Sequence, residues 1–86
     1  MQRSKQYRGI SKRLAANYLE NLDGERVEPD GDRVEGDGWS AALSEESVNP
    51  VGAIELSEVT VTFEGEAAVL EPLIERFDRK AIRAGG

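Results

Sequence analysis

The chain has 86 residues, a formal net charge of −6, and neither cysteine nor histidine. This length suits one domain, over residues 1–86, with a modest core. The missing residue types exclude disulfides, thiolate metal sites and Ser–His or Cys–His catalysis within the chain. No apolar run approaches the roughly 18 residues that span a bilayer, and the polar start lacks the apolar segment of a signal peptide. We therefore expect a cytoplasmic location without membrane contact.

Acidic residues dominate the composition. Seventeen Asp and Glu stand against eleven Lys and Arg, and eight of the eleven are Arg. A carboxylate-rich, lysine-poor surface stays hydrated in concentrated potassium chloride. The composition therefore favours the cytoplasm of a halophile, and an ordinary acidic bacterial protein is the alternative.

The N-terminal part predicts a basic arm followed by a helix. Residues 1–9 carry three bases and little apolar content, so we expect a loose arm. Ser11 is suited to cap a helix over 11–22, which Gly24 would end in a left-handed conformation. The helix is predicted from apolar residues that recur every four positions: Ile10, Leu14, Tyr18 and Leu22.

The middle of the chain reads as short extended segments. Residues 25–28 and 32–35 flank a predicted turn at 29–31. Alternation from Trp39 to Leu43 predicts a half-buried strand, and the polar residues 44–50 predict a connection. The pattern leaves open whether 33–43 is one bent strand or two.

The clearest strand signal lies in residues 54–63. Val59, Val61 and Phe63 share one face, and a change of parity before them predicts a bulge at Ser57–Glu58. The stripe Leu70, Leu73, Ile74, Phe77 and Ala81 then predicts a second helix. We expect this helix to begin near 68–71, to hold Pro72 in its first turn, and to run to Ala84.

The order of these elements predicts an α+β two-layer sandwich. An N-terminal helix, an antiparallel meander of three to four short strands and a C-terminal helix follow one another, and both helices should cover one face of the sheet. Because a domain of this size buries little surface, we expect a homodimer.

Basic residues cluster in sequence near both ends of the chain. Residues 1–19 contain five bases and no acids, whereas 20–78 contain all seventeen acids. If the helices pack antiparallel, the bases form one basic pole that could bind phosphate, a nucleotide or another anion. Alternatively, they pair with nearby acids and favour the helix dipole. The paucity of aromatic residues argues against nucleic acid. The candidate anion-binding residues are Lys12, Arg13, Arg76, Arg79, Lys80 and Arg83.

Other constellations assign no chemistry. The pairs Asp30/Asp32 and Glu45/Glu46, with Asp37, contain the oxygen ligands that magnesium or calcium prefers, but a hydrated acidic surface explains them better. Trp39 is expected in the core. No dinucleotide or phosphate-loop motif is present. We therefore assign no metal, no cofactor and no catalytic residue, and we do not expect an enzyme.

The last two residues offer another alternative. Gly85-Gly86 looks like the ending of ubiquitin-like modifiers and sulfur carriers, whose terminal carboxylate is adenylated and then conjugated or thiocarboxylated. Glycine suits a flexible, extended tail that threads an activating enzyme. Those carriers resemble one another in a β-grasp fold in which a strand delivers the tail, whereas here a helix is predicted directly before it.

Three segments carry a resemblance to known families. They are Gly36-Asp37-Gly38-Trp39, residues 58–65 (EVTVTFEG) and residues 79–86 (RKAIRAGG). Through them the chain is similar to a family of small haloarchaeal proteins, and it resembles the accessory C-terminal domain of MoaD-related (molybdopterin-synthase sulfur-carrier-related) proteins. The resemblance implies an accessory role near molybdopterin or sulfur transfer, with a protein partner. Our leading hypothesis is a non-enzymatic accessory or interaction domain.

Overall fold

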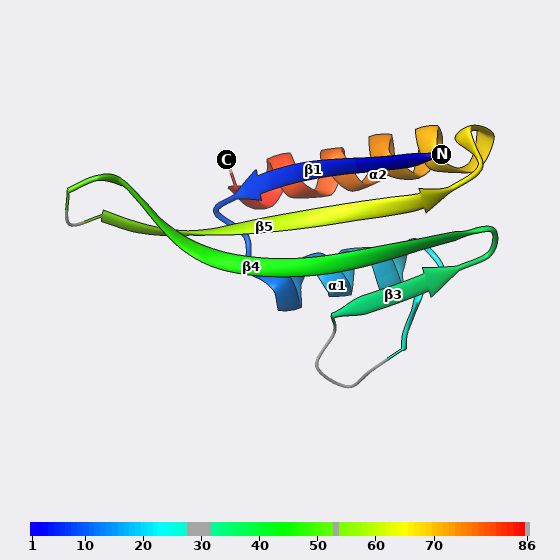
Figure 1. Cartoon of the computed structure of the whole chain (residues 1–86), viewed down its shortest axis with the longest axis horizontal. Helices are drawn as coiled ribbons and strands as arrows, with labels where there is room; N and C mark the ends of the chain where they lie inside the picture. The colour runs from blue at the N-terminus through cyan, green and yellow to red at the C-terminus, as the bar shows by residue number, and fades with distance from the viewer. Residues whose placement is uncertain (28–31, 53, 86) are drawn as a thin grey trace.

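The computed structural model describes residues 1–27, 32–52 and 54–85, and over these residues the chain forms a five-stranded antiparallel sheet and two helices. Both helices cover one face of the sheet (Figure 1). The α+β class and the antiparallel arrangement are therefore confirmed, with more strands than predicted. In chain order the elements are β1 (Gln2–Arg8), α1 (Lys12–Asn21), β2 (Glu25–Arg26), β3 (Arg33–Gly36), β4 (Trp39–Val51), β5 (Ile54–Gly65) and α2 (Ala67–Gly85).

The order of strands across the sheet is β1-β5-β4-β3-β2. Strands β2 to β5 form the predicted meander. The prediction of a loose arm over residues 1–9 is wrong, because β1 pairs along its whole length with β5, from Gln2 opposite Glu64 to Arg8 opposite Glu58. The fold therefore begins with a strand, and that strand closes the edge of the sheet beside β5.

The core lies between the sheet and the helices. Val59, Val61 and Phe63 of β5 are buried in this core, as the alternation of apolar residues predicted. Phe77 of α2 is its centre, because the rings of Tyr7, Tyr18 and Phe63 surround it in edge-to-face contacts with centroid distances of 4.9, 6.0 and 5.8 Å. Such contacts add to the free energy of burial and join β1, α1 and β5 to α2.

Helix α1 begins as predicted and ends differently. The Ser11 side chain accepts a hydrogen bond from the Leu14 amide at 3.1 Å, which confirms the N-cap. The left-handed residue at the C-terminal end is Asp23 (φ 73°), so the assignment of that role to Gly24 is wrong. Gly24 is required for packing, because a Cβ there would lie 2.6 Å from a methyl group of Val34.

Helix α2 begins earlier than the prediction. The Glu66 carbonyl accepts from the amides of Val69 and Leu70, both at 2.9 Å, and Ala67 is the first helical residue. Pro72 therefore lies in the second turn instead of the first. The helix continues to Gly85, which was expected in a flexible tail, and Gly86 lies outside the described residues.

The central segment is a pair of hairpins. Residues 33–43 form two strands with a turn at Asp37–Gly38. Residues 44–50, predicted as a connection, instead continue β4, because they pair with β5 in a ribbon that extends beyond the helices (Figure 1). The register shift lies between Val48 and Val51, so the predicted bulge at Ser57–Glu58 is wrong. The predicted turn at 29–31 lies outside the described residues.

Candidate functional site

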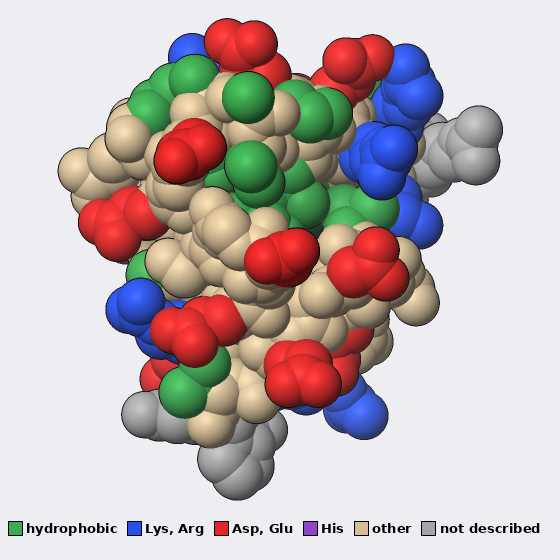
Figure 2. Space-filling model, turned by 90° about the vertical axis from the view of Figure 1, so that its right-hand side faces the viewer, with side chains coloured by type: hydrophobic (Ala, Val, Ile, Leu, Met, Phe, Trp, Pro, Cys, Tyr) green, Lys and Arg blue, Asp and Glu red, His purple; other side chains and the backbone are tan. Residues whose placement is uncertain are grey.

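A hollow of about 230 Å³, lined by apolar and charged residues in similar measure, lies at the end of the molecule where α1 ends, β3 turns into β4 and α2 begins. Figure 2 shows that hydrophobic side chains gather in the middle of this end, that acidic side chains lie around them, and that basic side chains adjoin them on the right-hand side of the view. The hollow is lined by Leu22, Asp23, Asp37, Trp39, Val69, Pro72, Leu73 and Arg76.

Trp39 forms the buried wall of the hollow and is also part of the core. Its side chain is only 8% exposed. The indole lies against Gly36, where a Cβ would come within 2.1 Å of the ring, and against Gly24. The two glycines thus fix the ring at this position. The sequence predicted Trp39 as a core residue and missed that it also borders an open hollow.

Three charged side chains stand at the rim. Asp23 follows α1, Asp37 lies in the β3–β4 turn, and Arg76 projects from α2. None of the three makes an ion pair or a side-chain hydrogen bond with any residue that the structure describes. The rim therefore offers carboxylates and a guanidinium that the fold itself does not use.

A second, more open hollow of about 520 Å³ lies on the other side of the same turn. Gly38 and Gly65 line it, and Glu64 and Glu66 add two more carboxylates. We call the two hollows together the end surface. Its described charged side chains are four acids, Asp23, Asp37, Glu64 and Glu66, and one base, Arg76, and Met1, which carries the amino terminus, also lines the second hollow.

The predicted anion-binding residues are divided by the fold. The helices run antiparallel, so the start of α1, with Lys12 and Arg13, lies near the end of α2 (Figure 1). Lys12 forms an ion pair with Asp32, and Arg79 pairs with Glu75 at 2.6 Å. Arg76 lies in the hollow beside the other end of α1. Lys80 follows Arg79 on α2, the side chain of Arg83 lies outside the described residues, and anion binding stays a prediction.

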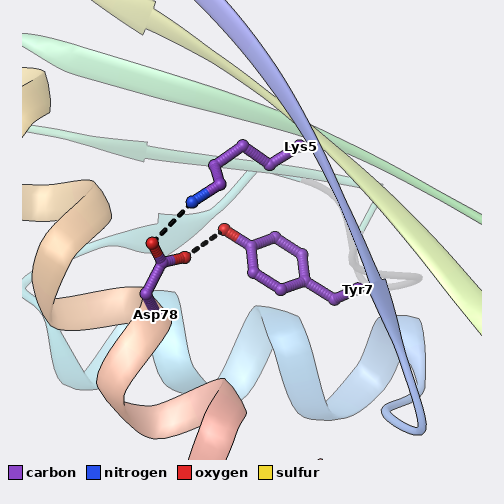
Figure 3. A network of polar contacts seen from close by, with 3 residues as sticks. All are labelled: Lys5, Tyr7 and Asp78. Atoms are coloured by element: carbon purple, nitrogen blue, oxygen red, sulfur yellow. Dashed lines mark hydrogen bonds and ion pairs between the residues drawn. The ribbon is translucent and has the colours of Figure 1, made fainter.

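A polar network connects β1 to α2 (Figure 3). The Tyr7 hydroxyl donates to one carboxylate oxygen of Asp78 at 2.6 Å, and the Lys5 ammonium donates to the other at 2.5 Å. Burial raises the pKa of the Tyr7 phenol well above its ordinary value of about 10, and the hydrogen bond and negative charge of Asp78 raise it further. The sequence analysis missed this network because it did not predict β1.

Neither a cluster of metal ligands nor a membrane-spanning helix is found among the described residues. No group of three or more acids among them is placed to hold a metal ion. No helix in the described part of the chain is long and apolar enough to cross a membrane.

The fold and the end surface define a small α+β domain with a partly apolar hollow at one end, beside which acids outnumber bases. The sequence profile of the archaeal MoaD-like proteins matches residues 3–86, which is nearly the whole chain. The chain therefore belongs to the archaeal MoaD-like protein family. A comparison with curated proteins finds no match.

Proposed function

We propose that this chain is a non-enzymatic accessory domain that binds a MoaD-type sulfur carrier. The observation that carries the proposal is the family match over residues 3–86, combined with a fold that continues as helix to Gly85. The first feature links the chain to sulfur-carrier biochemistry. The second favours an accessory role over that of the carrier.

A carrier needs its last glycines on an extended segment, because the activating enzyme must reach the terminal carboxylate through a narrow channel. Gly85 is instead the last residue of α2. Presenting it in extended form would require α2 to unwind at its end. The alternative of a sulfur carrier or protein modifier is therefore less well supported than an accessory domain.

The size and the lining of the hollow support protein binding over catalysis. Small-molecule sites usually enclose about 300–1,000 Å³, whereas the hollow beside Trp39 holds about 230 Å³. The second hollow, of about 520 Å³, has a sufficient volume but is shallow and open to solvent, so it encloses little. The smaller volume beside Trp39 suits one anchoring side chain of a protein partner. We assign the Lys5–Tyr7–Asp78 network a structural role, because its two hydrogen bonds hold β1 against α2.

Calorimetric titration with a purified archaeal MoaD-type sulfur carrier tests the proposal. We expect saturable binding with a dissociation constant in the micromolar range, as is typical of transient partners. A matched variant that lacks Gly85 and Gly86 should bind equally well. Absence of binding contradicts the proposal, and covalent adducts that require the two glycines would establish the carrier alternative instead.

A further inference from the structure

We propose that the end surface docks a basic, amphipathic segment of the partner protein, in which one apolar side chain enters the hollow beside Trp39 and Lys or Arg residues flank it. The inference deepens the proposed function and rests on it only for the identity of the partner. The chemistry of the segment follows from the volume, the charge and the pairing pattern of the end surface.

The hollow selects an apolar anchor. Val69, Pro72 and Leu73 of α2 line it together with Leu22, the C-cap residue of α1, and Trp39. A single aliphatic or aromatic side chain that enters this space removes apolar surface of both partners from water, at about 25 cal/mol per Å². Central anchors of this kind dominate the binding energy of most protein interfaces.

The acids of the end surface favour a partner segment that carries Lys or Arg beside the apolar anchor. The six ion pairs among the described residues all lie elsewhere: Lys5–Asp78, Arg8–Glu58, Lys12–Asp32, Arg26–Glu20, Arg33–Glu35 and Arg79–Glu75. None of the four acids of the end surface takes part in these pairs. Glu25, Glu46 and Glu71 elsewhere are also without an ion pair to any described residue, so what distinguishes the four acids is their place beside the hollows. Complementary charges on a partner would meet carboxylates that give up no internal ion pair on binding.

The single base gives the segment a direction. Arg76 stands on the α2 side of the hollow, whereas Asp23 and Asp37 belong to the end of α1 and the β3–β4 turn. The flanking bases of the partner are therefore expected toward Asp23 and Asp37. A backbone carbonyl or an acidic side chain of the partner is expected toward Arg76, whose guanidinium donates hydrogen bonds.

Three synthetic peptides of equal length test the inference without the carrier. Each has the same leucine anchors, and the flanking positions are all Lys, all Gln or all Glu. Trp39 is the only tryptophan, so its emission reports occupancy of the hollow. We expect the Lys peptide to shift this emission and to bind about tenfold more tightly than the Gln peptide, and the Glu peptide to bind weakest.

Paired variants locate the binding. Neutralising the rim in D23N/D37N should weaken the Lys peptide about tenfold, whereas the control E25Q/E46Q removes the same charge from exposed positions outside both hollows and should change little. Equal affinity for the three peptides, or equal loss in the two variants, overturns the inference. A carrier that binds D23N/D37N as well as the unmodified chain also overturns it and leaves the proposed function intact. If the Lys peptide binds as expected and the carrier does not bind, the inference stands and the proposed function fails.

Discussion

The contact between Trp39 and Gly36 sets the shape of the hollow. A Cβ at position 36 would lie 2.1–2.4 Å from three atoms of the indole, which no small adjustment relieves. We expect Gly36→Ala to lower the free energy of unfolding by about 2–4 kcal/mol, measured by urea unfolding with Trp39 emission. Glu35→Ala is the control, because its exposed ion pair with Arg33 is worth at most about 1 kcal/mol. Equal losses in the two variants would refute this account of the glycine.

The Tyr7–Asp78 hydrogen bond makes stability depend on pH in the alkaline range. The pKa of Tyr7 is raised in the folded chain, so its contribution is complete below the ordinary value of about 10 and is lost as the pH rises further. The free energy of unfolding should therefore fall above pH 10, by up to about 1.4 kcal/mol per pH unit from this one group. Tyr7→Phe should flatten that fall, and identical pH profiles would contradict the assignment.

At the scale of elements, β1 is the strand that carries least sequence signal. The bonds from the Gly65 amide to the Met1 carbonyl and from the Gly9 amide to the Ser57 carbonyl, at 3.1 and 3.0 Å, place the odd-numbered residues of β1 in bonded pairs with β5. The amides of even-numbered residues therefore point away from the sheet. A proline in β1 should therefore destabilise the fold at an odd-numbered position and be tolerated at an even-numbered one.

We expect Arg3→Pro to destabilise the fold by about 1–3 kcal/mol, because it removes a bond to β5. Gln6→Pro should cost much less, because proline is tolerated at an edge strand where the amide faces solvent. Thermal unfolding of the two variants measures the difference. Equal destabilisation would show that β1 does not pair in this register.

The elements with local signals were predictable, and those with distant partners were not. The apolar stripes of α1 and α2 and the alternation at Val59, Val61 and Phe63 lie within short windows, so periodicity identified them. Strand β1 has mostly polar residues, and its partner β5 lies far along the chain. The extension of β4 beyond Leu43 begins with Ser44–Ser47, which are all exposed, so no buried face imposes alternation on them.

The candidate site was less predictable than the fold. Its hollow combines the end of α1, the β3–β4 turn and the first half of α2, which only tertiary packing brings together. The sequence identified Trp39 as buried and placed Arg76 with other bases of α2. Whether those bases face a basic pole or a hollow depends on how α1 packs on α2, and no local pattern encodes this.

The charge of the whole molecule predicts its response to salt. The chain has a net charge of −6, so its excess acidic groups repel one another. At 1 M salt the Debye length is only about 3 Å, so this repulsion is already screened at that concentration. If the acidic surface is a halophilic adaptation, the unfolding temperature should continue to rise between about 1 and 3 M potassium chloride. A curve that becomes flat by about 1 M would indicate an ordinary acidic domain.

The central claim is that a MoaD-type sulfur carrier binds the end surface, and backbone NMR of the labelled chain during titration with the carrier tests it most directly. We predict shifts at Leu22–Asp23, Asp37–Trp39, Glu64–Glu66 and Val69–Arg76, including the indole N–H of Trp39. Residues 4–8 of β1 and the β4–β5 ribbon should change little. Shifts confined to those two segments, or none at saturating carrier, would contradict the account.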